Sequence, residues 1–497
     1  MKSRIDRLAI AGLLLLLCAC NPAPKYARPP APTPSAFKET LPPGYKEGAG
    51  WKLAEPGDDK IRAKWWEMYN DAQLNALEEQ VSISNQTIAA AEANFRAARA
   101  LVVSGRAALF PTLSAAPSYA NSRTSATARS SRAPITTTLN TFSMPLDLSY
   151  TVDFWHRIRN TLAANTYSAQ ASAADVATAL LSTQAELATI YLQLRAVDMQ
   201  RRILTETLAN YRQALDLTTT LYKTGINSEQ EVSQAQTQVN VATAQTTDLG
   251  VARTQYEHAI ATLIGKPASS FTLDAAPFAV NPPKIPVAVP SALLERRPDV
   301  AALERQVEAA NALIGVARAA YYPNLTLSAT AGFQTSDFTQ WFTWPSRFWS
   351  VGPTLSQTLF DAGARRALNA QAQAQYDAAV ANYRETVLTS FQAVEDQLAA
   401  LRILSQEAAE QQAAVASSTR YLDLANTRFR TGVDSYLNVV AAQTSLLNNR
   451  QVEVEVQLRQ MTASVALILA LGGGWDNSQL PQMKNFVSHS TSPSSGP

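Results

Sequence analysis

The stretch FSMPLDLSYTVDF, from Phe142 to Phe154, alternates without interruption between apolar residues and small or polar ones. A period of two places alternate side chains on opposite faces of a β-strand, so this stretch predicts a strand with one apolar face. The apolar positions are Phe142, Met144, Leu146, Leu148, Tyr150, Val152 and Phe154. The sequence that follows is alanine-rich and predicts long helix. The fold must therefore accommodate a long amphipathic strand in a mostly helical chain.

Composition narrows the class of protein. The 497 residues could form several domains, and 42 Lys and Arg against 40 Asp and Glu give no reason to expect a nucleic acid partner. Charged residues make up only 16% of the chain, which is low for a soluble helical protein. No apolar run after residue 20 approaches the roughly 20 residues of a membrane-spanning helix. Any contact with a membrane is therefore expected to use another element.

The N-terminus predicts export and lipidation. A basic start followed by the short apolar run Leu8 to Leu17 is typical of a signal peptide, here residues 1–19. The signal ends in Leu17-Cys18-Ala19-Cys20, which resembles the lipobox of bacterial lipoproteins. That resemblance implies S-diacylglycerol and an N-acyl chain on Cys20, and Asn21 in the next position implies sorting to the outer membrane. The alternative is an ordinary signal peptide with incidental cysteines.

Two terminal segments are expected to lie outside the folded body. Residues 20–60 are interpreted as a lipidated arm, and their proline-rich part, from Pro22 to Pro43, predicts extended chain that cannot form helix. Residues 476–497 form a tail whose end is rich in Ser, Pro and Gly, and this tail is expected to be partly disordered.

The body between these segments is a tandem repeat. Leu101, Arg106 and Pro111 recur 212 positions later, and LYKTGINS, at 221–228, recurs 207 positions later as RFRTGVDS, at 428–435. The two units are residues 61–276 and 291–475, joined by the proline-rich link 277–290. In the first unit we expect strands at about 111–121 and 138–154, a long helix at 156–223 and a return helix at 228–264. In the second we expect strands at about 323–335 and 348–360, then helices at 363–430 and 434–471.

The long helices have coiled-coil spacing, because apolar residues recur every three or four positions, as at Leu187, Ile190 and Leu194. An ordinary helical bundle would explain these seams equally well. It would not explain helices about 100 Å long, at about 1.5 Å per residue, or the strands between them.

The strands predict an oligomer. A strand exposed to lipid must have all of its backbone groups paired, so a membrane sheet has to close into a barrel. Closure takes about eight strands, and each chain supplies four. Two chains would supply eight strands and three would supply twelve, and only the larger barrel leaves an open lumen. The alternative is a soluble sandwich, but the helical part offers no second layer to cover the strands.

These features together resemble the outer membrane factor family, the TolC-like channels of tripartite pumps of the RND type, and within it the NodT branch of lipoproteins. The resemblance covers essentially the whole mature chain. Its most specific motifs are LLERRPDV at 293–300, ARAAYYP at 317–323 and RFRTGV at 428–433. It implies a homotrimer in the outer membrane with a shared 12-stranded barrel. It also implies a coiled-coil helical tunnel through the periplasm that docks to an adaptor, or membrane fusion protein, and to an inner-membrane transporter.

The sequence contains no motif for catalysis. His156, His258 and His489 are far apart, and HExxH, CxxC and phosphate-binding loops are absent from the sequence. We therefore expect no enzyme activity, no cofactor beyond the lipid on Cys20 and no metal site. The expected function is passive conduction of drugs and other small organic compounds. The alternatives are heavy-metal efflux, type I protein secretion, or a coiled-coil envelope lipoprotein that forms no channel.

The functional residues are expected at the two Thr-Gly turns between the long helices and their return helices. The resemblance implies that these tips contact the adaptor and that the helix after Gly432 lines the constriction. Where family members often carry Asp and Arg, this chain has Ala441 and Thr444, so we predict an apolar gate at Leu437, with Tyr436 and Val440 as neighbours. The expected tip residues are Thr224, Gly225, Ile226, Asn227, Thr431, Gly432, Val433 and Asp434.

Overall fold

The computed structural model of the chain describes residues 21–39, 64–123, 125, 138–276, 278, 282–283, 285 and 293–482. The predicted signal peptide and the lipidation site at Cys20 lie outside the described residues. So do residues 40–60 of the arm, residues 61–63 at the start of the first repeat, most of the link and residues 483–497 of the tail.

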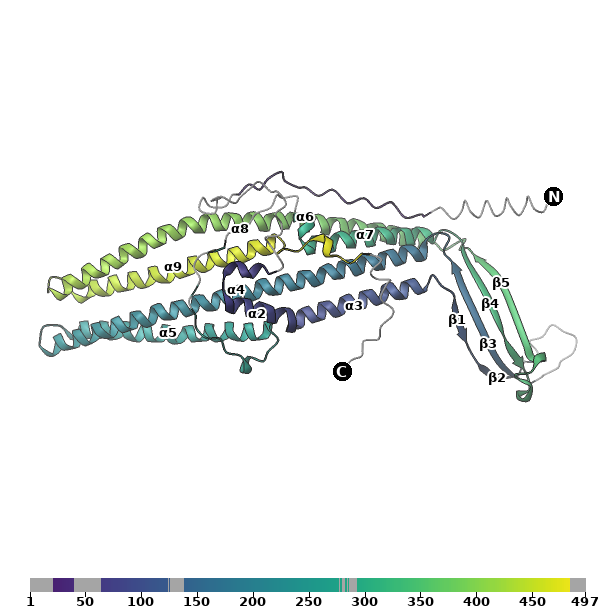
Figure 1. Ribbon diagram of the computed structural model, residues 1–497, viewed down its shortest axis with the longest axis horizontal. Helices are drawn as coiled ribbons and strands as arrows, with labels where there is room; N and C mark the ends of the chain where they lie inside the picture. The colour runs from purple at the N-terminus through teal and green to yellow at the C-terminus, as the bar shows by residue number, and fades with distance from the viewer. Residues whose placement is uncertain are drawn as a thin grey trace.

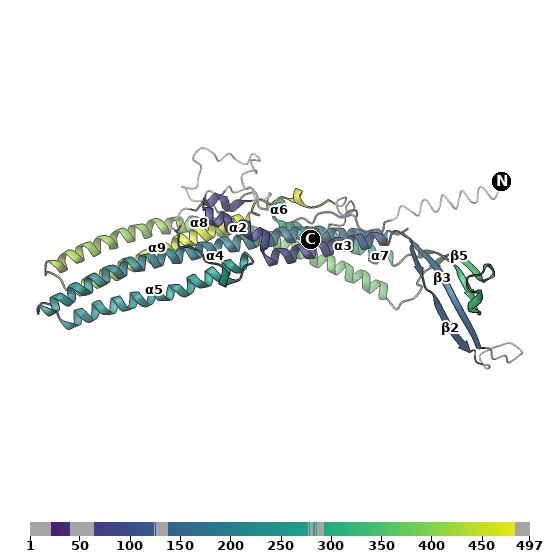
Figure 2. The ribbon, with the colours of Figure 1, turned by 60° about the horizontal axis from the view of Figure 1, so that its bottom comes forward.

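The molecule is elongated, with a β-sheet at one end and two helical hairpins at the other (Figure 1). The long helices α4 (Arg157–Lys223) and α8 (Ala364–Arg430) each have 67 residues, so each is about 100 Å long. Their return helices, α5 (Glu229–Leu263) and α9 (Tyr436–Ala470), each have 35 residues. A view turned by 60° shows both hairpins ending together, far from the sheet (Figure 2).

Shorter elements surround the middle of the long helices. The sheet-side half of α4 packs against α3 and α7, and α7 also packs against α8. Pro298 occupies the first turn of α7, where its missing N–H costs no helix hydrogen bond, and the Asp299 carboxylate follows at the positive end of the helix dipole. These elements are η3 (Trp65–Tyr69), α2 (Ala72–Ser84), α3 (Gln86–Ala107), η5 (Ala268–Ser270), α6 (Leu293–Arg296), α7 (Pro298–Ala319) and η9 (Asn477–Gln479).

The sheet is an antiparallel meander that combines strands from both repeats. Its central strands, β3 (Thr138–Val152) and β4 (Asn324–Thr335), pair from Phe142 with Thr335 to Val152 with Leu325. The strand β5 (Arg347–Ser356) pairs with β4, and two short 3-10 turns, η7 (Phe338–Gln340) and η8 (Trp344–Ser346), connect them. The fold class expected from the sequence, mostly helical with amphipathic strands from a tandem repeat, is confirmed.

Three strand boundaries differ from those predicted. The strand expected over 138–154 ends at Val152, because Asp153 caps α4 instead of continuing the strand. The first strand, expected over about 111–121, is divided into β1 (Thr112–Ala115) and β2 (Ser118–Arg123), both paired with β3. The division falls at Pro117, which has no backbone N–H to donate to the ladder. The last strand ends at Ser356 rather than 360 because its partner Asn324 is the first residue of β4, which leaves nothing in this chain for later residues to pair with.

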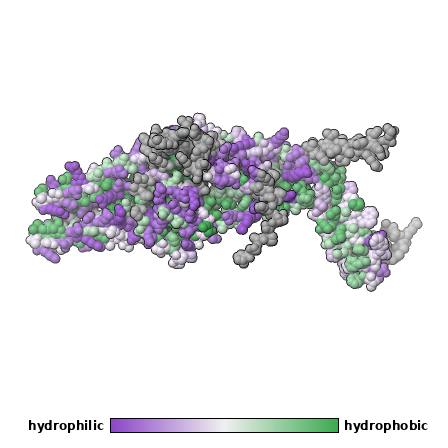
Figure 3. All heavy atoms as spheres, viewed as in Figure 1, coloured by the Kyte–Doolittle hydropathy of each residue, from purple (hydrophilic) through white to green (hydrophobic). Residues whose placement is uncertain are grey.

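The register of the sheet places apolar residues of neighbouring strands opposite one another, and polar residues opposite polar ones. Leu148 lies opposite Leu113 on one side and Ala329 on the other, and Ala329 lies opposite Val351. The next row is polar, with Ser149 opposite Thr112 and Ser328. One face is therefore apolar and the other polar over the width of the sheet, and the sheet is visibly less hydrophilic than the helical body (Figure 3). Within the described chain, none of the helices is both long enough and apolar enough to cross a bilayer.

The largest apolar core lies at mid-length, where α2 and η3 cover α4. It contains Trp65, Leu74, Leu187, Leu194 and other side chains from α7, α8 and α9. A buried ion network lies beside it. Arg195 contacts Asp198 at 3.0 Å, and Asp198 also accepts a hydrogen bond from Arg253 of α5 at 2.8 Å. The network fixes α4 against α5 at the point where the return helix ends.

Residues 21–39 form an extended arm along α7 and α8, as the proline content predicts (Figure 1). Polar contacts occur along its whole length and alternate with apolar ones. Gly315 of α7 allows the arm to pass, since a Cβ there would lie 2.5 Å from that of Ala23. The polar contacts join Asn21 to Asn160, Asn311 to Pro24 O, Arg28 to Glu304, Arg384 to Pro30 O, and Arg402 to Glu39.

Candidate functional site

The two helical hairpins end in turns of the same backbone geometry. Gly225 and Gly432 have φ values of +79° and +72°, the left-handed region in which a residue with a Cβ is strained. In each turn the glycine and the residue after it close the helix end. Gly225 N donates to Tyr222 O and Ile226 N to Leu221 O, both at 2.9 Å; Gly432 N and Val433 N bond in the same pattern. The repeated Thr-Gly sequence thus specifies two equal helix stops at the end opposite the sheet.

Both turns expose an apolar side chain directly after the glycine. Ile226 is 72% exposed and Val433 is 64% exposed. A large aliphatic side chain this exposed is a candidate contact for another protein, because covering it removes apolar surface from water. All eight predicted tip residues lie in these two turns, and most are exposed; Asn227 and Asp434 are partly buried.

The polar groups of the two turns differ. In the first, Glu231 accepts a hydrogen bond from Ser228 N at 3.2 Å, and the Ser228 side chain accepts one from the backbone of Glu231, which together form a capping box. In the second, Arg428 Nε donates to Asp434 Oδ2 and Asn438 Nδ2 donates to Oδ1, both at 2.8 Å. The Arg428 side chain lowers the pKa of the Asp434 carboxyl. Arg428 and Asn438 are not among the site residues predicted from the sequence. Asn438 lies one helical turn after Asp434, and Arg428 lies across the tight turn before it.

The predicted gate residues point in different directions. Leu437 is 57% exposed, whereas Tyr436 is 1% exposed and packs on Phe429 with ring centroids 5.4 Å apart. Val440 is partly buried against the same cluster, which joins both hairpins through Ala235 and Ala425. Tyr436 and Val440 therefore hold the turn of α9 against its neighbours, and Leu437 is the predicted gate residue that faces away from the chain.

Leu437 continues into an uncharged stripe on α9. Ala441 and Thr444 follow it at helical spacing of four and three residues, and both are exposed. At these two positions the resemblance to outer membrane factors implies Asp and Arg, and this chain has neither. The exposed face of α9 next to the tip therefore carries one large apolar side chain and no ionisable group as far as Thr444.

The described residues contain no group of three or more His, Cys, Asp or Glu side chains arranged to hold a metal ion. His156 lies beside the sheet and His258 lies near the end of α5. His489 and Cys20 fall outside the described residues.

Comparison with known proteins gives a consistent result. The family model "Outer membrane efflux protein" matches residues 77–266 and 289–473, one match for each repeat. The toluene efflux pump outer membrane protein TtgC of Pseudomonas putida is 31% identical over 480 residues, which cover 94% of this chain and 95% of the relative. The pyoverdine export outer membrane protein OpmQ of Pseudomonas aeruginosa is 30% identical over 482 residues, which cover 95% of this chain and 98% of the relative. The solved structure of the outer-membrane channel OprN matches with a TM-score of 0.83 and 26% identity, covering 92% of this chain and all of that one. Together with the two-repeat fold and its amphipathic sheet, these matches place the chain in the outer membrane efflux protein family.

Proposed function

We propose that three copies of this chain form one continuous conduit from the periplasm to the exterior. The observation that carries the proposal is the register of the sheet, which makes one face apolar and the other polar across strands of both repeats. A face of this kind fits lipid outside and water inside a closed barrel. The sheet of one chain is open, with β1 and β2 at one edge and β5 at the other, so closure pairs these edges between copies.

The conduit is passive, and the energy for export comes from the partner transporter. It belongs to a tripartite system with a periplasmic adaptor and an inner-membrane transporter. The relatives are named for toluene efflux and pyoverdine export, which supports small organic compounds as the exported class. Heavy-metal efflux and type I protein secretion are the alternatives within this architecture. A coiled-coil lipoprotein without a channel would leave the amphipathic sheet without a role.

The two turns form the docking surface for the adaptor. Ile226 and Val433 supply exposed apolar contacts, and the turn backbones around Gly225 and Gly432 have no neighbouring atoms where a Cβ would stand, so a partner can approach closely. Polar residues lie beside these contacts in each turn: Thr224 and Asn227 in the first, and Thr431 and Asp434 in the second.

Leu437 forms the gate. Threefold symmetry would bring three copies near the axis, where their side chains exclude water and so block ions by dewetting. Tyr436 and Val440 fix the position of Leu437 by packing into the hairpins. Ala441 and Thr444 carry no charge, so an electrostatic latch cannot form at these two positions and the closure rests on apolar contact.

The lipid on Cys20 anchors the chain beside the barrel. Asn21, the next residue, exchanges hydrogen bonds with Asn160 in the first turn of α4. The arm therefore begins next to the sheet, at the level where an acyl chain on Cys20 can enter the membrane. More than one acyl chain is sufficient for stable anchoring.

Two measurements test the proposal together. Purified protein in detergent should have the mass of three chains by native mass spectrometry, and it should form ion-conducting pores in planar bilayers. A monomer that retains its strands would refute the shared barrel. A trimer that never conducts, even when Leu437 is replaced by alanine, would instead support the lipoprotein without a channel.

A further inference from the structure

The two repeats place an arginine at the same point, four residues after the aspartate that ends each strand-to-helix connection. In the first repeat these residues are Asp153 and Arg157, and in the second they are Asp361 and Arg365. The chain turns into each helix through a left-handed residue, His156 at φ +55° and Gly363 at φ +92°. The equivalent arginines nevertheless have different partners.

Arg365 is neutralised within the chain. Its Nε donates to Asp361 Oδ2 at 2.5 Å, and its guanidinium lies 5.6 Å from the ring centroid of Tyr321. Asp153, in contrast, uses both carboxylate oxygens to cap α4, accepting hydrogen bonds from Ile158 N and Arg159 N at 2.9 Å each. Arg157 is exposed, and its guanidinium has no hydrogen bond or ion pair among the residues that the structure describes.

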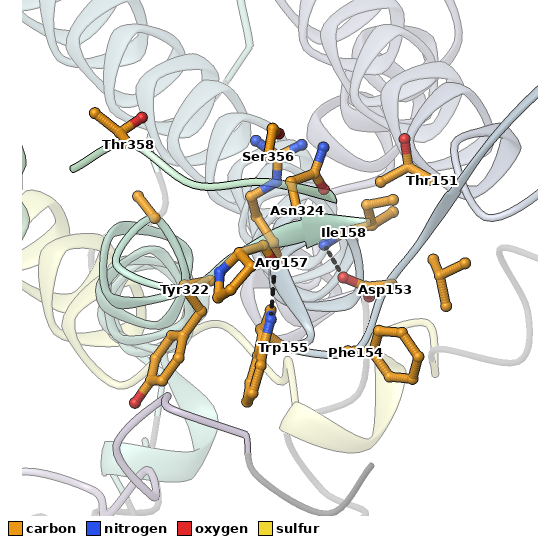
Figure 4. Close-up of a pocket in the computed structure, with 14 residues that line it drawn as sticks. Thr151, Asp153, Phe154, Trp155, Arg157, Ile158, Tyr322, Asn324, Ser356 and Thr358 are labelled. Atoms are coloured by element: carbon orange, nitrogen blue, oxygen red, sulfur yellow. Dashed lines mark hydrogen bonds between the residues drawn. The ribbon is translucent and has the colours of Figure 1, made fainter. Parts of the chain in front are cut away.

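Arg157 lines a polar recess at the end of the sheet. The recess has a volume of about 190 Å³, and its polar lining includes Thr151, Asn324 and Ser356. The Asp153 carboxylate also lines it, and its two oxygens accept the hydrogen bonds that cap α4. Asn324 pairs with Ser356, and the register places both in polar rows of the sheet, as it does Thr151. In Figure 4 these three side chains and Arg157 lie on one side of the strand ends, and the rings of Trp155 and Tyr322 lie on the other.

The apolar side of the recess is closed. Trp155 and Tyr322 stack with centroids 4.4 Å apart, and Trp155 Nε1 donates to Pro323 O at 3.0 Å. The recess therefore opens towards the polar face, which is the water-filled side of the proposed barrel. This step rests on the proposed function, since the polar face lines a lumen only if copies of the chain close the barrel.

We propose that Arg157 is an anion-recognition residue at the junction of the barrel and the helical tunnel. Three copies place three guanidinium groups, none of them in an ion pair within the described residues, around the lumen. They attract the carboxylate or another anionic group of the exported compound, with the hydroxyl and amide groups of Ser356 and Asn324 as hydrogen-bonding partners. A ring of fixed positive charge at a pore wall raises the local concentration of anions and so sets ion preference.

The test is the reversal potential of trimers in planar bilayers under a gradient of KCl, and separately of potassium benzoate as a carboxylate probe. Removing the charge with Arg157→Gln should lower the permeability of chloride relative to potassium roughly twofold at 0.1 M salt. That is the size expected for three charges screened over about 10 Å. Benzoate permeability should fall at least as much. At 1 M salt, where screening acts over about 3 Å, the difference should largely disappear.

Matched variants separate charge from structure. Arg157→Lys keeps the charge and should behave as the wild type. The double variant Asp361→Asn, Arg365→Gln removes the paired arginine and its partner together, and should leave the reversal potential unchanged. Arg157→His provides a switch within one assembled protein, since the imidazole should act like arginine at pH 5 and like glutamine at pH 8.

The outcomes are distinct. An unchanged permeability ratio in Arg157→Gln, or in Arg157→His between the two pH values, overturns the proposal while the channel itself stands. If Arg157→Gln does not assemble into trimers, the test is the permeability ratio of Arg157→His at pH 5 compared with pH 8. Recordings are also made in the Leu437→Ala background so that a narrow tip does not mask the effect. Failure of that channel to conduct at all would refute the proposed function rather than this residue's role alone.

Discussion

Glu78 is a carboxylic acid buried in the apolar stripe of α2, and its removal should stabilise the protein. The side chain is fully buried between Leu74, Leu77 and Val81, and neither of its carboxyl oxygens has a hydrogen-bond partner. Burial raises the pKa of Glu78 from 4.5 to about 9. The folded protein therefore holds a proton on Glu78 at neutral pH, and the unfolded chain does not.

This difference makes stability fall as pH rises. Between pH 4.5 and about 9, Glu78 ionises in the unfolded state and stays protonated in the folded state. Ionisation lowers the free energy of the unfolded state, so the free energy of unfolding falls as pH rises. Each pH unit is equivalent to about 1.4 kcal/mol, so the cost of Glu78 at pH 7 is about 3 kcal/mol relative to a group that does not titrate. Glu78→Leu should recover this free energy and extend the apolar stripe of α2.

The assay is thermal unfolding of the detergent-solubilised protein, followed by circular dichroism from pH 5 to pH 8.5. The unfolding midpoint of Glu78→Leu should exceed that of the wild type, and the gap should widen as pH rises. Glu79→Leu is the matched control, because Glu79 is exposed and pairs with Lys64 at 2.6 Å. If Glu78→Leu and the wild type lose stability with pH at the same rate, Glu78 is ionised in the folded state and the reasoning is wrong.

Three further changes test the gate, the arm and the anchor. Leu437→Ala should raise single-channel conductance, whereas acidification to pH 5 should change it little, because Arg428 lowers the pKa of Asp434 and the pair stays ionised; opening by acid alone would contradict an apolar gate. Gly315→Ala should displace the arm and speed its proteolysis, whereas Gly250→Ala, where a Cβ meets no atom within 4 Å, should not. Cys20→Ala should abolish incorporation of labelled palmitate and leave trimers intact; continued labelling would exclude Cys20 as the lipid site.

The sheet and the long helices could be predicted because their causes are local. Strict alternation around Leu148 specifies which face of β3 is apolar, and the same period in β4 forces rows of like residues once the strands pair. The helices lack internal proline, and Gly225 and Gly432 mark where they stop. The division of the first strand was not predicted, although its cause, Pro117, is local and removes a ladder hydrogen bond.

The rest depended on contacts between distant segments. Tyr436 and Leu437 are neighbours in sequence, and only the packing of α9 against α8 and both hairpins determines which of them is buried. The arm shows the same dependence, because Glu395 binds the backbone N–H groups of Lys38 and Glu39 across more than 350 residues. The burial of Glu78 could not be predicted from its residue type, because it depends on the packing of α2 against α4. In each case the missing information was the rotation of one helix about its axis.

The unequal chemistry of the two tips has a consequence for how an adaptor would bind. In the repeat alignment, Leu221 and Asn227 occupy the positions of Arg428 and Asp434, so the second turn carries an ion pair whose two positions are uncharged in the first. A trimer would therefore present six tips of two alternating kinds around the end of the tunnel. The contacts common to all six are the exposed Ile226 and Val433. Apolar contacts at these positions can supply affinity at every tip, whereas the Arg428–Asp434 pair can distinguish one kind of tip from the other and so set the rotational register of the adaptor.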